Sequence, residues 1–209
     1  MRIVIFTNGK LSKAFLRDIR DDDYVIGVDR AAYWLIQHGI TPHAAVGDFD
    51  SVTAEELVLI RKKSGKLIRY PAVKDATDTE LAVHTAIRRE PEEVIIFGGV
   101  GSRLDHVLGN IHLLEILHIR GIDAYLRDER NEIFLLSSRR TIKYSSRYRY
   151  VSLLPYTGSV TVSLRGFKYP LVRAVLRRGS TRGISNEMTG KEASIRVHEG
   201  IVVVIRSKD

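Results

Sequence analysis

The 209-residue sequence contains no cysteine, which excludes disulfide bonds and thiolate metal sites. It also has no apolar run that approaches the roughly 18 residues of a membrane-spanning helix. The apolar stretch at residues 1–7 is not followed by a small-residue cleavage motif, so we interpret it as a first β-strand rather than a signal peptide. These absences lead us to expect a soluble, cytoplasmic protein with no membrane partner.

Thermolabile residue types are scarce as well. The chain has one glutamine, four asparagines and two methionines, whereas 28% of its residues are charged. This composition is typical of proteins from thermophilic sources. A melting midpoint of about 50 °C, an ordinary value for a mesophilic domain, would argue against that interpretation.

Acidic residues are few in the C-terminal part of the chain. Residues 1–130 contain 18 lysines and arginines and 20 acidic residues, a net charge of −2, whereas residues 131–209 contain 15 and 5, a net charge of +10. A shift of this size predicts a domain boundary near residue 130. The basic part could contact nucleic acid, an anionic substrate or an acidic neighbouring surface, or it could be a solvated face.

Residues 1–130 alternate apolar strand-like runs with helical patterns. The expected strands are 2–7, 24–28, 44–46, 66–70, 94–97 and 122–126. The expected helices lie near 11–20, 30–38, 53–64, 77–89 and 103–119. Such alternation predicts an α/β domain with a mostly parallel sheet covered by helices.

Residues 131–209 have no long helical pattern. Short β-branched runs, separated by glycine turns, lie at 132–136, 140–144, 150–154, 159–164, 194–197 and 201–205. This pattern predicts a small all-β sandwich or barrel. The polar segment 180–187, taken alone, indicates a surface turn.

A pair of carboxylates, Asp48 and Asp50, follows the third expected strand in Gly47-Asp48-Phe49-Asp50-Ser51. On an extended segment, residues two apart project to the same side, so both could hold one Mg²⁺ or its waters. Gly47 would let the backbone approach a ligand closely. The alternative is an acidic loop in which Ser51 caps a helix.

A second acidic loop contains Asp75, Thr77 and Asp78. If Thr77 is the N-cap of the next helix, Asp78 is its first residue, and the helix dipole favours Asp78 whatever its function. That explanation does not account for Asp75. Lys74, beside them, could reach a phosphate.

A glycine-rich loop, Gly98-Gly99-Val100-Gly101-Ser102, lies between an expected strand and a helix that begins near Arg103. Free backbone N–H groups at such a turn can hold a phosphate, although the glycine spacing fits neither a Walker A loop nor a dinucleotide motif. Arg103, Asp105 and His106 follow, and a lone histidine here is more often structural than catalytic. Asp29 ends the second expected strand and could contact a ribose or metal-bound water, or cap a helix.

Together, these segments resemble the thiamine pyrophosphokinase family, especially its bacterial branch. The matching segments are Gly47–Ser51, Lys74–Ala82, Gly98-Gly99 with Arg103-x-Asp105-His106 and Asn110, and Arg182–Glu187. Each motif is modest alone, but the ordered set of four is specific and spans nearly the whole chain. The resemblance implies an α/β catalytic domain over residues 1–130, which binds ATP and magnesium, and a β-sandwich over residues 131–209, which binds thiamine.

The resemblance also implies a reaction and roles for individual residues. ATP and thiamine would give thiamine diphosphate and AMP, with one pyrophosphoryl group transferred to the thiamine hydroxyl. The implied catalytic residues are Asp48, Asp50, Asp78 and Asp105, the first three of which would hold Mg²⁺. Those around ATP and the metal are Asp29, Asp75, Thr77, Arg103 and His106. Ser185 and Asn186 correspond to the loop that contacts thiamine.

Family members are usually homodimers whose thiamine pocket combines the C-terminal loop of one subunit with the catalytic domain of the other. The charge difference between the two parts of this chain would suit such a contact. Two departures from the family pattern stand out. Asp29-Arg30-Ala31-Ala32 replaces a glycine-containing segment of the family. Some members present a tryptophan to the thiamine ring from the β domain, whereas the only tryptophan here, Trp34, lies on an expected N-terminal helix, where we expect it in the core or at an interface.

Two other functions fit parts of the sequence. One is a different Mg²⁺-dependent nucleotidyl or diphosphate transferase, with another alcohol as acceptor. The other is a basic nucleic-acid-binding protein, which the charge of residues 131–209 favours. Against it, the acidic loops would repel a polyanion, and the basic strands lack an aromatic-rich stacking surface. We therefore expect small-molecule substrates and no nucleic-acid partner.

Overall fold

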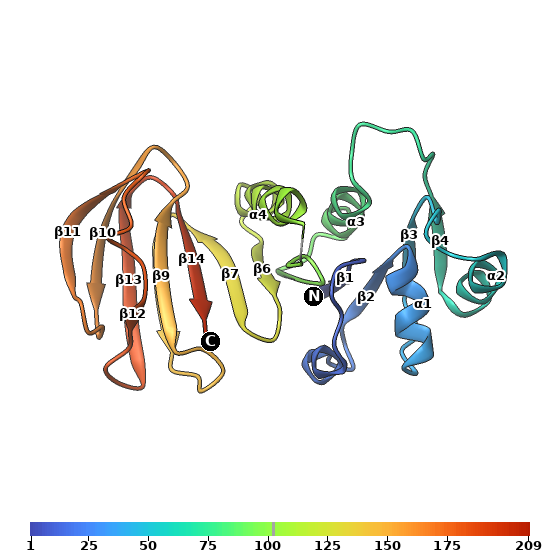
Figure 1. The fold of residues 1–209 in the computed structure, drawn as a ribbon, viewed down its shortest axis with the longest axis horizontal. Helices are drawn as coiled ribbons and strands as arrows, with labels where there is room; N and C mark the ends of the chain where they lie inside the picture. The colour runs from blue at the N-terminus through green and yellow to red at the C-terminus, as the bar shows by residue number, and fades with distance from the viewer. Residues whose placement is uncertain (102) are drawn as a thin grey trace. The chain divides into compact units, whose positions relative to one another are not determined.

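The structure is a computed structural model that describes residues 1–101 and 103–209. It divides into two compact units, Met1–Glu129 and Arg130–Asp209 (Figure 1), and the division falls where the charge composition changes. Ser102, part of the glycine-rich loop, lies outside the described residues. Among the helices that are described, none is long and apolar enough to cross a membrane.

The first unit is the expected α/β domain. Its strands are β1 (Arg2–Phe6), β2 (Tyr24–Val28), β3 (Ala44–Gly47), β4 (Lys66–Arg69), β5 (Glu93–Phe97) and β6 (Asp123–Arg127). Its helices are η1 (Lys13–Asp18), α1 (Arg30–Gln37), α2 (Ala54–Lys63), α3 (Asp78–Ile87) and α4 (Leu104–His118). The strands pair in parallel in the order β6-β5-β1-β2-β3-β4. The helix expected near 11–20 is a 3-10 helix, η1.

Strand alternation divides the core of this unit between the two faces of the sheet. On one face, Val4 and Phe6 of β1 pack with Phe15 of η1 and Leu35 of α1. Trp34 is partly buried against the same cluster, as expected of a core residue. Helices α3 and α4 cover the other face (Figure 1), where α3 contacts β1, β2 and β3. Strands β1, β2, β3 and β5 are almost wholly buried and are nearly continuous apolar runs, whereas β4 and β6 keep exposed polar residues.

The strand order reverses direction at β1. Strands β2, β3 and β4 extend the sheet to one side of β1, whereas β5 and β6 lie on its other side. The connections therefore diverge at the carboxyl ends of β1 and β5, which is where open α/β sheets bind ligands.

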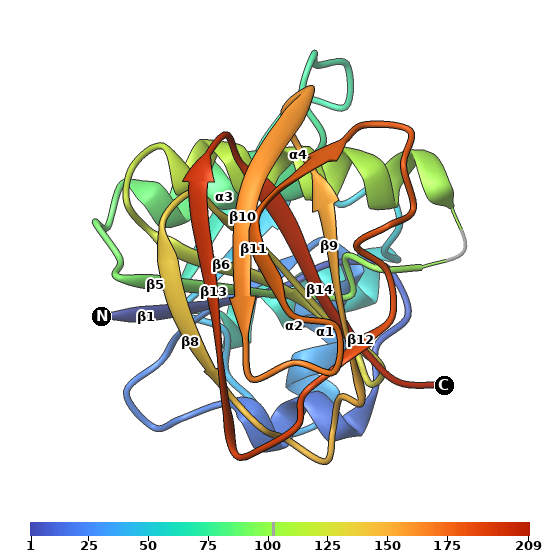
Figure 2. The same ribbon diagram turned by 90° about the vertical axis from the view of Figure 1, so that its left-hand side faces the viewer.

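The second unit is the expected all-β domain. Its strands are β7 (Asn131–Leu136), β8 (Arg139–Lys143), β9 (Tyr150–Pro155), β10 (Ser159–Arg165), β11 (Leu171–Arg177), β12 (Asn186–Glu187), β13 (Glu192–Glu199) and β14 (Val202–Ser207). Two sets of antiparallel strands form, β12-β9-β14-β7 and β11-β10-β13-β8. Figure 2 looks onto the second set, with the first behind it.

The sequence did not indicate two of these strands. In β11, Arg173 has φ 43°, which interrupts the apolar and polar alternation that marks a strand. Strand β12 has only two residues and lies inside the segment that we interpreted as a surface turn.

Candidate active site

A cavity of about 800 Å³ opens at the carboxyl ends of the parallel strands. Its walls come from the loop Thr7–Lys10 after β1, from Asp29 after β2, from the start of α3 and from the segment after β5 that leads into α4. These are the loops that meet where the strand order reverses. The volume is in the ordinary range for a small-molecule site.

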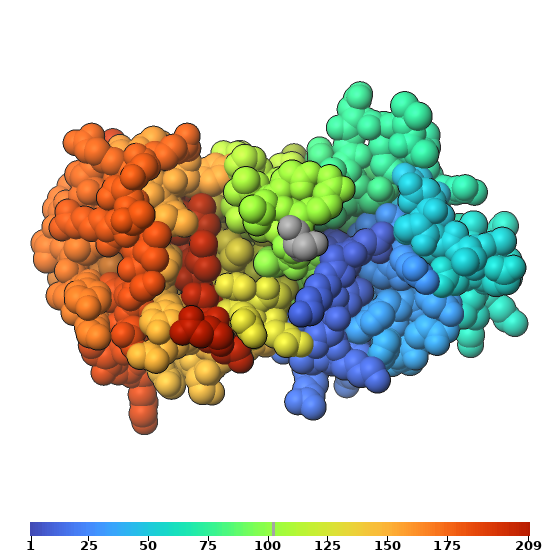
Figure 3. Space-filling view, in the orientation of Figure 1, coloured from blue at the N-terminus to red at the C-terminus, as the bar shows by residue number. Residues whose placement is uncertain are grey.

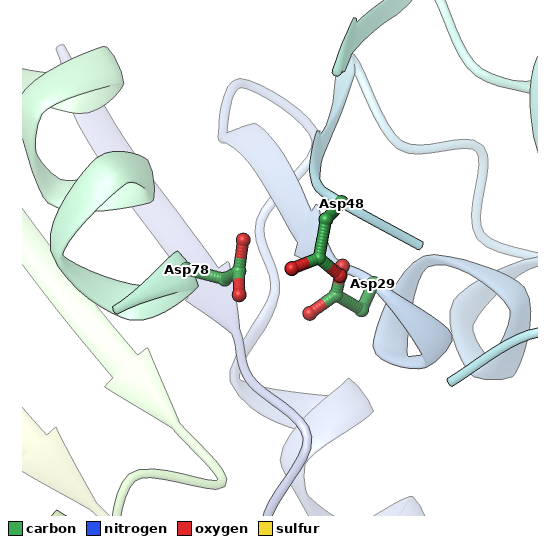
Figure 4. Close-up of side chains that lie close together, drawn as sticks. All are labelled: Asp29, Asp48 and Asp78. Atoms are coloured by element: carbon green, nitrogen blue, oxygen red, sulfur yellow. The ribbon is translucent and has the colours of Figure 1, made fainter. Parts of the chain in front are cut away.

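Three carboxylates converge in this region. Asp29 follows β2, Asp48 follows β3 and Asp78 begins α3, and one oxygen of each lies within 4.8 Å of the others (Figure 4). We call these three residues the carboxylate triad. Like charges this close repel one another unless a cation or a proton offsets them.

Asp29 is held in an unusual conformation. Its φ is 44°, its side chain is buried, and its Oδ1 accepts a hydrogen bond of 3.0 Å from Phe49 N. Burial, together with the negative charges of Asp78 and Asp48, raises the pKa of Asp29 to about 6. The environment therefore disfavours a third negative charge in the triad as it stands.

The alternative that the Asp29 side chain caps α1 is wrong. Asp29 occupies the N-cap position, but its carboxylate makes no capping hydrogen bond. Asn8 caps the helix instead, because its Oδ1 accepts a hydrogen bond of 2.9 Å from Ala31 N. The Asp29 carboxylate therefore belongs to the triad and not to the helix cap.

Gly47 makes room for that carboxylate. Its φ is 151°, and a Cβ added at Gly47 would lie 1.8 Å from Asp29 Oδ1. We expected glycine here to allow the approach of a ligand. The neighbour that requires it in the structure is the Asp29 side chain.

Lys74 is the cation nearest to the triad. Its Nζ donates hydrogen bonds to Asp48 Oδ2 at 2.8 Å and to Asp78 Oδ1 at 2.6 Å. The bond from Lys74 holds the pKa of Asp48 below its usual value. The two carboxylates also raise the pKa of Lys74, against the opposing effect of its burial. Lys74 therefore links two members of the triad.

Asp50 is not a member of the triad, although its side chain lies next to that of Asp48. Its side chain is exposed and lines the cavity, and its backbone N donates a hydrogen bond of 3.1 Å to Asp48 Oδ1. Phe49 has φ 61°, so the chain between the two aspartates is not extended. The premise of an extended segment is therefore wrong, although the side chains of Asp48 and Asp50 still interact, since a hydrogen bond with Asp50 helps to lower the pKa of Asp48. Burial of the Phe49 ring in the core holds this turn in place.

The loop before α3 separates its two aspartates. Thr77 is the N-cap of α3, since its Oγ1 accepts from Glu80 N at 3.2 Å, and Asp78 is the first helical residue, both as expected. Thr77 and Asp78 also line the cavity. Asp75 is exposed, and among the described residues it belongs to neither the cavity wall nor the triad.

The start of α4 contributes charged groups to the rim. Arg103 and His106 line the cavity, and Arg103 forms an exposed ion pair of 2.6 Å with Asp105. The bond from Arg103 lowers the pKa of Asp105. Asp105 itself lines a smaller neighbouring cavity of about 220 Å³. Further along α4, the buried Asn110 donates to Gly99 O at 2.9 Å and so fixes the glycine-rich loop.

Sequence reasoning missed the loop after β1. Asn8 donates hydrogen bonds to Asp29 Oδ2 at 3.4 Å and to Ser51 Oγ at 3.3 Å. Gly9 packs against Gly98 so closely that an added Cβ would lie 1.9 Å from Gly98 O. The signal was available, because this loop ends the first strand of an α/β pattern and ligands bind at such ends.

Ser185 and Asn186 lie in the second unit. Ser185 is exposed with φ 58°, and its N donates to Ser152 Oγ at 3.0 Å. Asn186 is buried, and its amide holds the backbone of Tyr169 through bonds of 3.0 Å to Tyr169 N and 2.8 Å to Tyr169 O. Tyr169 and Asn186 help to line a cavity of about 300 Å³ within this unit.

The fold and the site define a two-unit protein with an acidic, glycine-lined cavity at the switch point of a parallel sheet. The first unit matches the family model "Thiamin pyrophosphokinase, catalytic domain" over residues 15–126. The second matches "Thiamin pyrophosphokinase, vitamin B1 binding domain" over residues 139–202. The chain belongs to the thiamin pyrophosphokinase family.

Individual relatives agree with this assignment. The chain is 39% identical to thiamine pyrophosphokinase of Bacillus subtilis (strain 168) over 186 residues, which cover 88% of this chain and 87% of that protein. The crystal structure of thiamine pyrophosphokinase from Bacillus subtilis superposes with a TM-score of 0.93 and 34% identity, with both chains fully covered. That of thiamin pyrophosphokinase from Geobacillus thermodenitrificans gives a TM-score of 0.90 and 36% identity, covering 100% of this chain and 98% of that one.

Proposed function

We propose that this protein transfers the pyrophosphoryl group of ATP to the hydroxyl of thiamine, giving thiamine diphosphate and AMP, and that the transfer takes place in the cavity beside the carboxylate triad. The observation that carries the site assignment is the convergence of Asp29, Asp48 and Asp78 at the switch point of the unit that matches the catalytic-domain model. Membership of the family supports the reaction itself.

The donor set of the triad suits Mg²⁺. Three carboxylates offer hard oxygen ligands, which Mg²⁺ prefers, and no thiolate competes because the chain has no cysteine. Burial, with a smaller effect of the Asp78 and Asp48 charges, raises the pKa of Asp29 although Lys74 lowers it. In our proposal Asp29, Asp48 and Asp78 hold the metal. When bound, the ion would neutralise phosphate charge and favour the departure of AMP.

The remaining groups of the cavity bind and orient the nucleotide. Phosphoryl transfer depends mostly on positioning and charge neutralisation rather than covalent chemistry. Lys10 and Arg103 line the cavity and offer cations for phosphate oxygens. Gly98 and Gly99 have no side chain, so their backbone can lie close to the ligand. Thr77 and His106 also line the cavity. Asp105, paired with Arg103 beside the cavity, would act from the rim, whereas Asp75 lies outside the cavity wall.

The chemical step requires a proton acceptor. The thiamine hydroxyl oxygen forms a bond to the β-phosphorus, the bond from that phosphorus to the oxygen of the AMP leaving group breaks, and the hydroxyl proton must leave. We assign the acceptor role to Asp50, because it lines the cavity but lies outside the carboxylate triad. Its exposure leaves the carboxylate accessible to a substrate hydroxyl.

Thiamine binding belongs to the second unit in this proposal. The unit matches the vitamin B1 binding model, and Ser185 lies exposed beside the buried Asn186. Asn186 would act indirectly, by holding the backbone of Tyr169. We propose a homodimer in which the second unit of one subunit completes the active site of the other. The net charges of −2 and +10 for the two parts of the chain support such a contact.

The direct test is product identification. The purified protein is incubated with ATP, Mg²⁺ and thiamine, and nucleotides and thiamine esters are separated by chromatography. We expect AMP and thiamine diphosphate in equal amounts, and no AMP when thiamine is omitted. Formation of ADP with thiamine monophosphate, or nucleotide hydrolysis independent of thiamine, would contradict the proposal.

A further inference from the structure

Lys74 occupies the space between two carboxylates that the proposed function assigns to a divalent cation. Its Nζ is 2.8 Å from Asp48 Oδ2 and 2.6 Å from Asp78 Oδ1. The three side chains are largely shielded, with exposed fractions of 14% for Lys74, 10% for Asp48 and 21% for Asp78. The contact is therefore stronger than a typical surface ion pair, which solvent and salt weaken.

The segment that carries Lys74 has few other attachments. Residues 71–76 connect β4 to α3 and stand out from the surface of the first unit (Figure 3). Pro71 and Ala72 are exposed, and Val73 is 95% exposed. Within the described part of the chain, no backbone–backbone hydrogen bond involves residues 71–76. The Lys74 side chain can therefore leave its position without breaking a hydrogen bond of the sheet or of α3.

We propose that Lys74 is the internal counterion of the carboxylate triad, which stabilises the site before a divalent cation binds and is displaced from Asp48 and Asp78 when the cation arrives. This inference rests on the proposed function, because it takes the triad as the metal site. It adds that one residue of the chain competes with the metal and lowers the apparent affinity of the site.

The physical basis is a competition for the same two carboxylates. An ammonium and a metal ion that share two carboxylates lie close enough to repel each other. Binding of the ion must therefore include the loss of the Lys74 contacts, and that loss subtracts from the affinity. Removing the ammonium should make the triad more negative and the ion bind more tightly. It should also leave the metal-free site less stable.

The first test measures Mn²⁺ binding without nucleotide, by the loss of the electron paramagnetic resonance signal of free Mn²⁺. The variants are Lys74→Met, which removes the charge at similar length, and Lys74→Arg, which keeps it. Lys66→Met is the matched control, since Lys66 is an exposed lysine at the amino end of β4. We expect Lys74→Met to bind Mn²⁺ on the order of tenfold more tightly, with Lys74→Arg and Lys66→Met close to wild type.

The second test measures melting midpoints in EDTA and in saturating Mn²⁺. We expect Lys74→Met to melt below wild type in EDTA and the difference to shrink or disappear in Mn²⁺. A purely structural role for Lys74 would lower both midpoints and leave the Mn²⁺ affinity unchanged.

The third test labels lysines with an acylating reagent and reads modification by mass spectrometry. We expect Lys74 to react slowly in EDTA and severalfold faster in Mn²⁺, with Lys66 unaffected. Equal Mn²⁺ affinities of wild type and Lys74→Met, or unchanged Lys74 labelling, would overturn the inference and leave the proposed function intact. Absence of Mn²⁺ binding in both proteins would overturn the inference together with the metal site, whereas the AMP assay tests the reaction separately.

Discussion

Asp48 and Asp50 are two residues apart, but their carboxylates have different surroundings. Asp48 belongs to the carboxylate triad and bonds to Lys74, whereas Asp50 is exposed on the cavity wall. The difference arises at Phe49, whose positive φ turns the chain between them. Replacement of Asp48 and replacement of Asp50 should therefore have different effects on metal binding and turnover.

We expect Asp50→Asn to reduce kcat by about two to four orders of magnitude, the usual contribution of a proton acceptor, while the Mn²⁺ affinity stays near wild type. Asp48→Asn should weaken both Mn²⁺ binding and turnover, because it removes a proposed ligand. Steady-state kinetics and Mn²⁺ titration on the same preparations check this. Asp21→Asn, an exposed aspartate of the same unit, serves as control. Loss of Mn²⁺ binding in Asp50→Asn would instead make Asp50 a ligand.

Gly47 supplies a second prediction at this scale. Gly47→Ala places a methyl group against the Asp29 carboxylate and also requires an unfavourable φ, so we expect a loss of about 2–4 kcal/mol in unfolding free energy and weaker Mn²⁺ binding. Gly39→Ala is the matched control. Gly39 has φ 79° but open space around it, so only about 1 kcal/mol should be lost, with no effect on Mn²⁺. Urea unfolding of both variants separates the cost of the unfavourable φ from the cost of the clash with Asp29. Equal losses of unfolding free energy in the two variants would exclude a contribution from the clash.

Sequence reasoning at the residue scale found the acidic loops but not their pairing. Asp48 and Asp78 were predicted as metal ligands because the resemblance to the thiamine pyrophosphokinase family implies that role for them. The position of Asp29 depends on its own positive φ and on the space left by Gly47, neither of which is visible in residue spacing. Asn8 was missed because its three hydrogen bonds join segments that are 21 to 43 residues apart.

At the scale of elements, most helices and strands could be predicted from periodicity and turn residues. The expected strands of the first unit coincide with β1 to β6 to within one or two residues. Apolar runs and helix caps are local signals, and they were sufficient there. Strand β11 lacked such a signal, because it depends on pairing with β10 and contains an irregular register near Arg173. Partnership between strands is a tertiary property that a local pattern does not contain.

A buried ion pair joins β1 to the segment that precedes β2. Both carboxylate oxygens of Asp23 accept hydrogen bonds of 2.6 Å from the guanidinium of Arg2. Arg20 N donates a further bond of 2.7 Å to Asp23 Oδ2, and Arg2 also donates to Asp18 O at 2.7 Å. The pair therefore fixes the 3-10 helix η1 and its following turn against the first strand.

We expect Asp23→Asn to lose about 3 kcal/mol of unfolding free energy, because it leaves the Arg2 charge buried without a full partner. Burial alone would raise the pKa of Asp23, but the bonds from Arg2 and Arg20 outweigh it and lower the pKa. A lowered folded pKa gives stability that is present above the unfolded value of about 3.9 and lost as the pH falls through the folded value.

The difference in unfolding free energy between wild type and Asp23→Asn should therefore be largest near neutral pH and should decrease below about pH 4. Urea unfolding at several pH values measures it, with Asp22→Asn, an exposed neighbour, as control. A gap that is constant down to low pH would show that charge pairing is not the source of the stability.

At the scale of the whole molecule, the first unit carries the candidate metal site, whereas Ser185 and the vitamin B1 binding match lie in the second. Composition indicated this division, since the charge changes sign near residue 130. The sequence of one chain does not determine whether its two units serve the same active site or the sites of different subunits. That question is decided by assembly, which a functional mixing experiment can address.

Two inactive variants should restore activity when their subunits are mixed. Asp78→Asn removes a proposed metal ligand from the first unit, and Ser185→Lys places a positive charge beside the proposed site of the cationic thiamine ring in the second. If each active site combines units from two subunits, a heterodimer of these variants contains one site with no substitution. After equal mixing and subunit exchange, half of the dimers are heterodimers, so we expect about a quarter of wild-type activity.

Each variant alone, at the same total concentration, provides the control for the mixing experiment. Sedimentation velocity before and after mixing establishes whether species of twice the 23.6 kDa chain mass are present. Because the proposed contact joins parts of net charge −2 and +10, dimerisation should weaken as the salt concentration rises. If dimers form and exchange subunits but activity does not return, each chain must contain its own complete site, since every chain in the mixture then carries one defect.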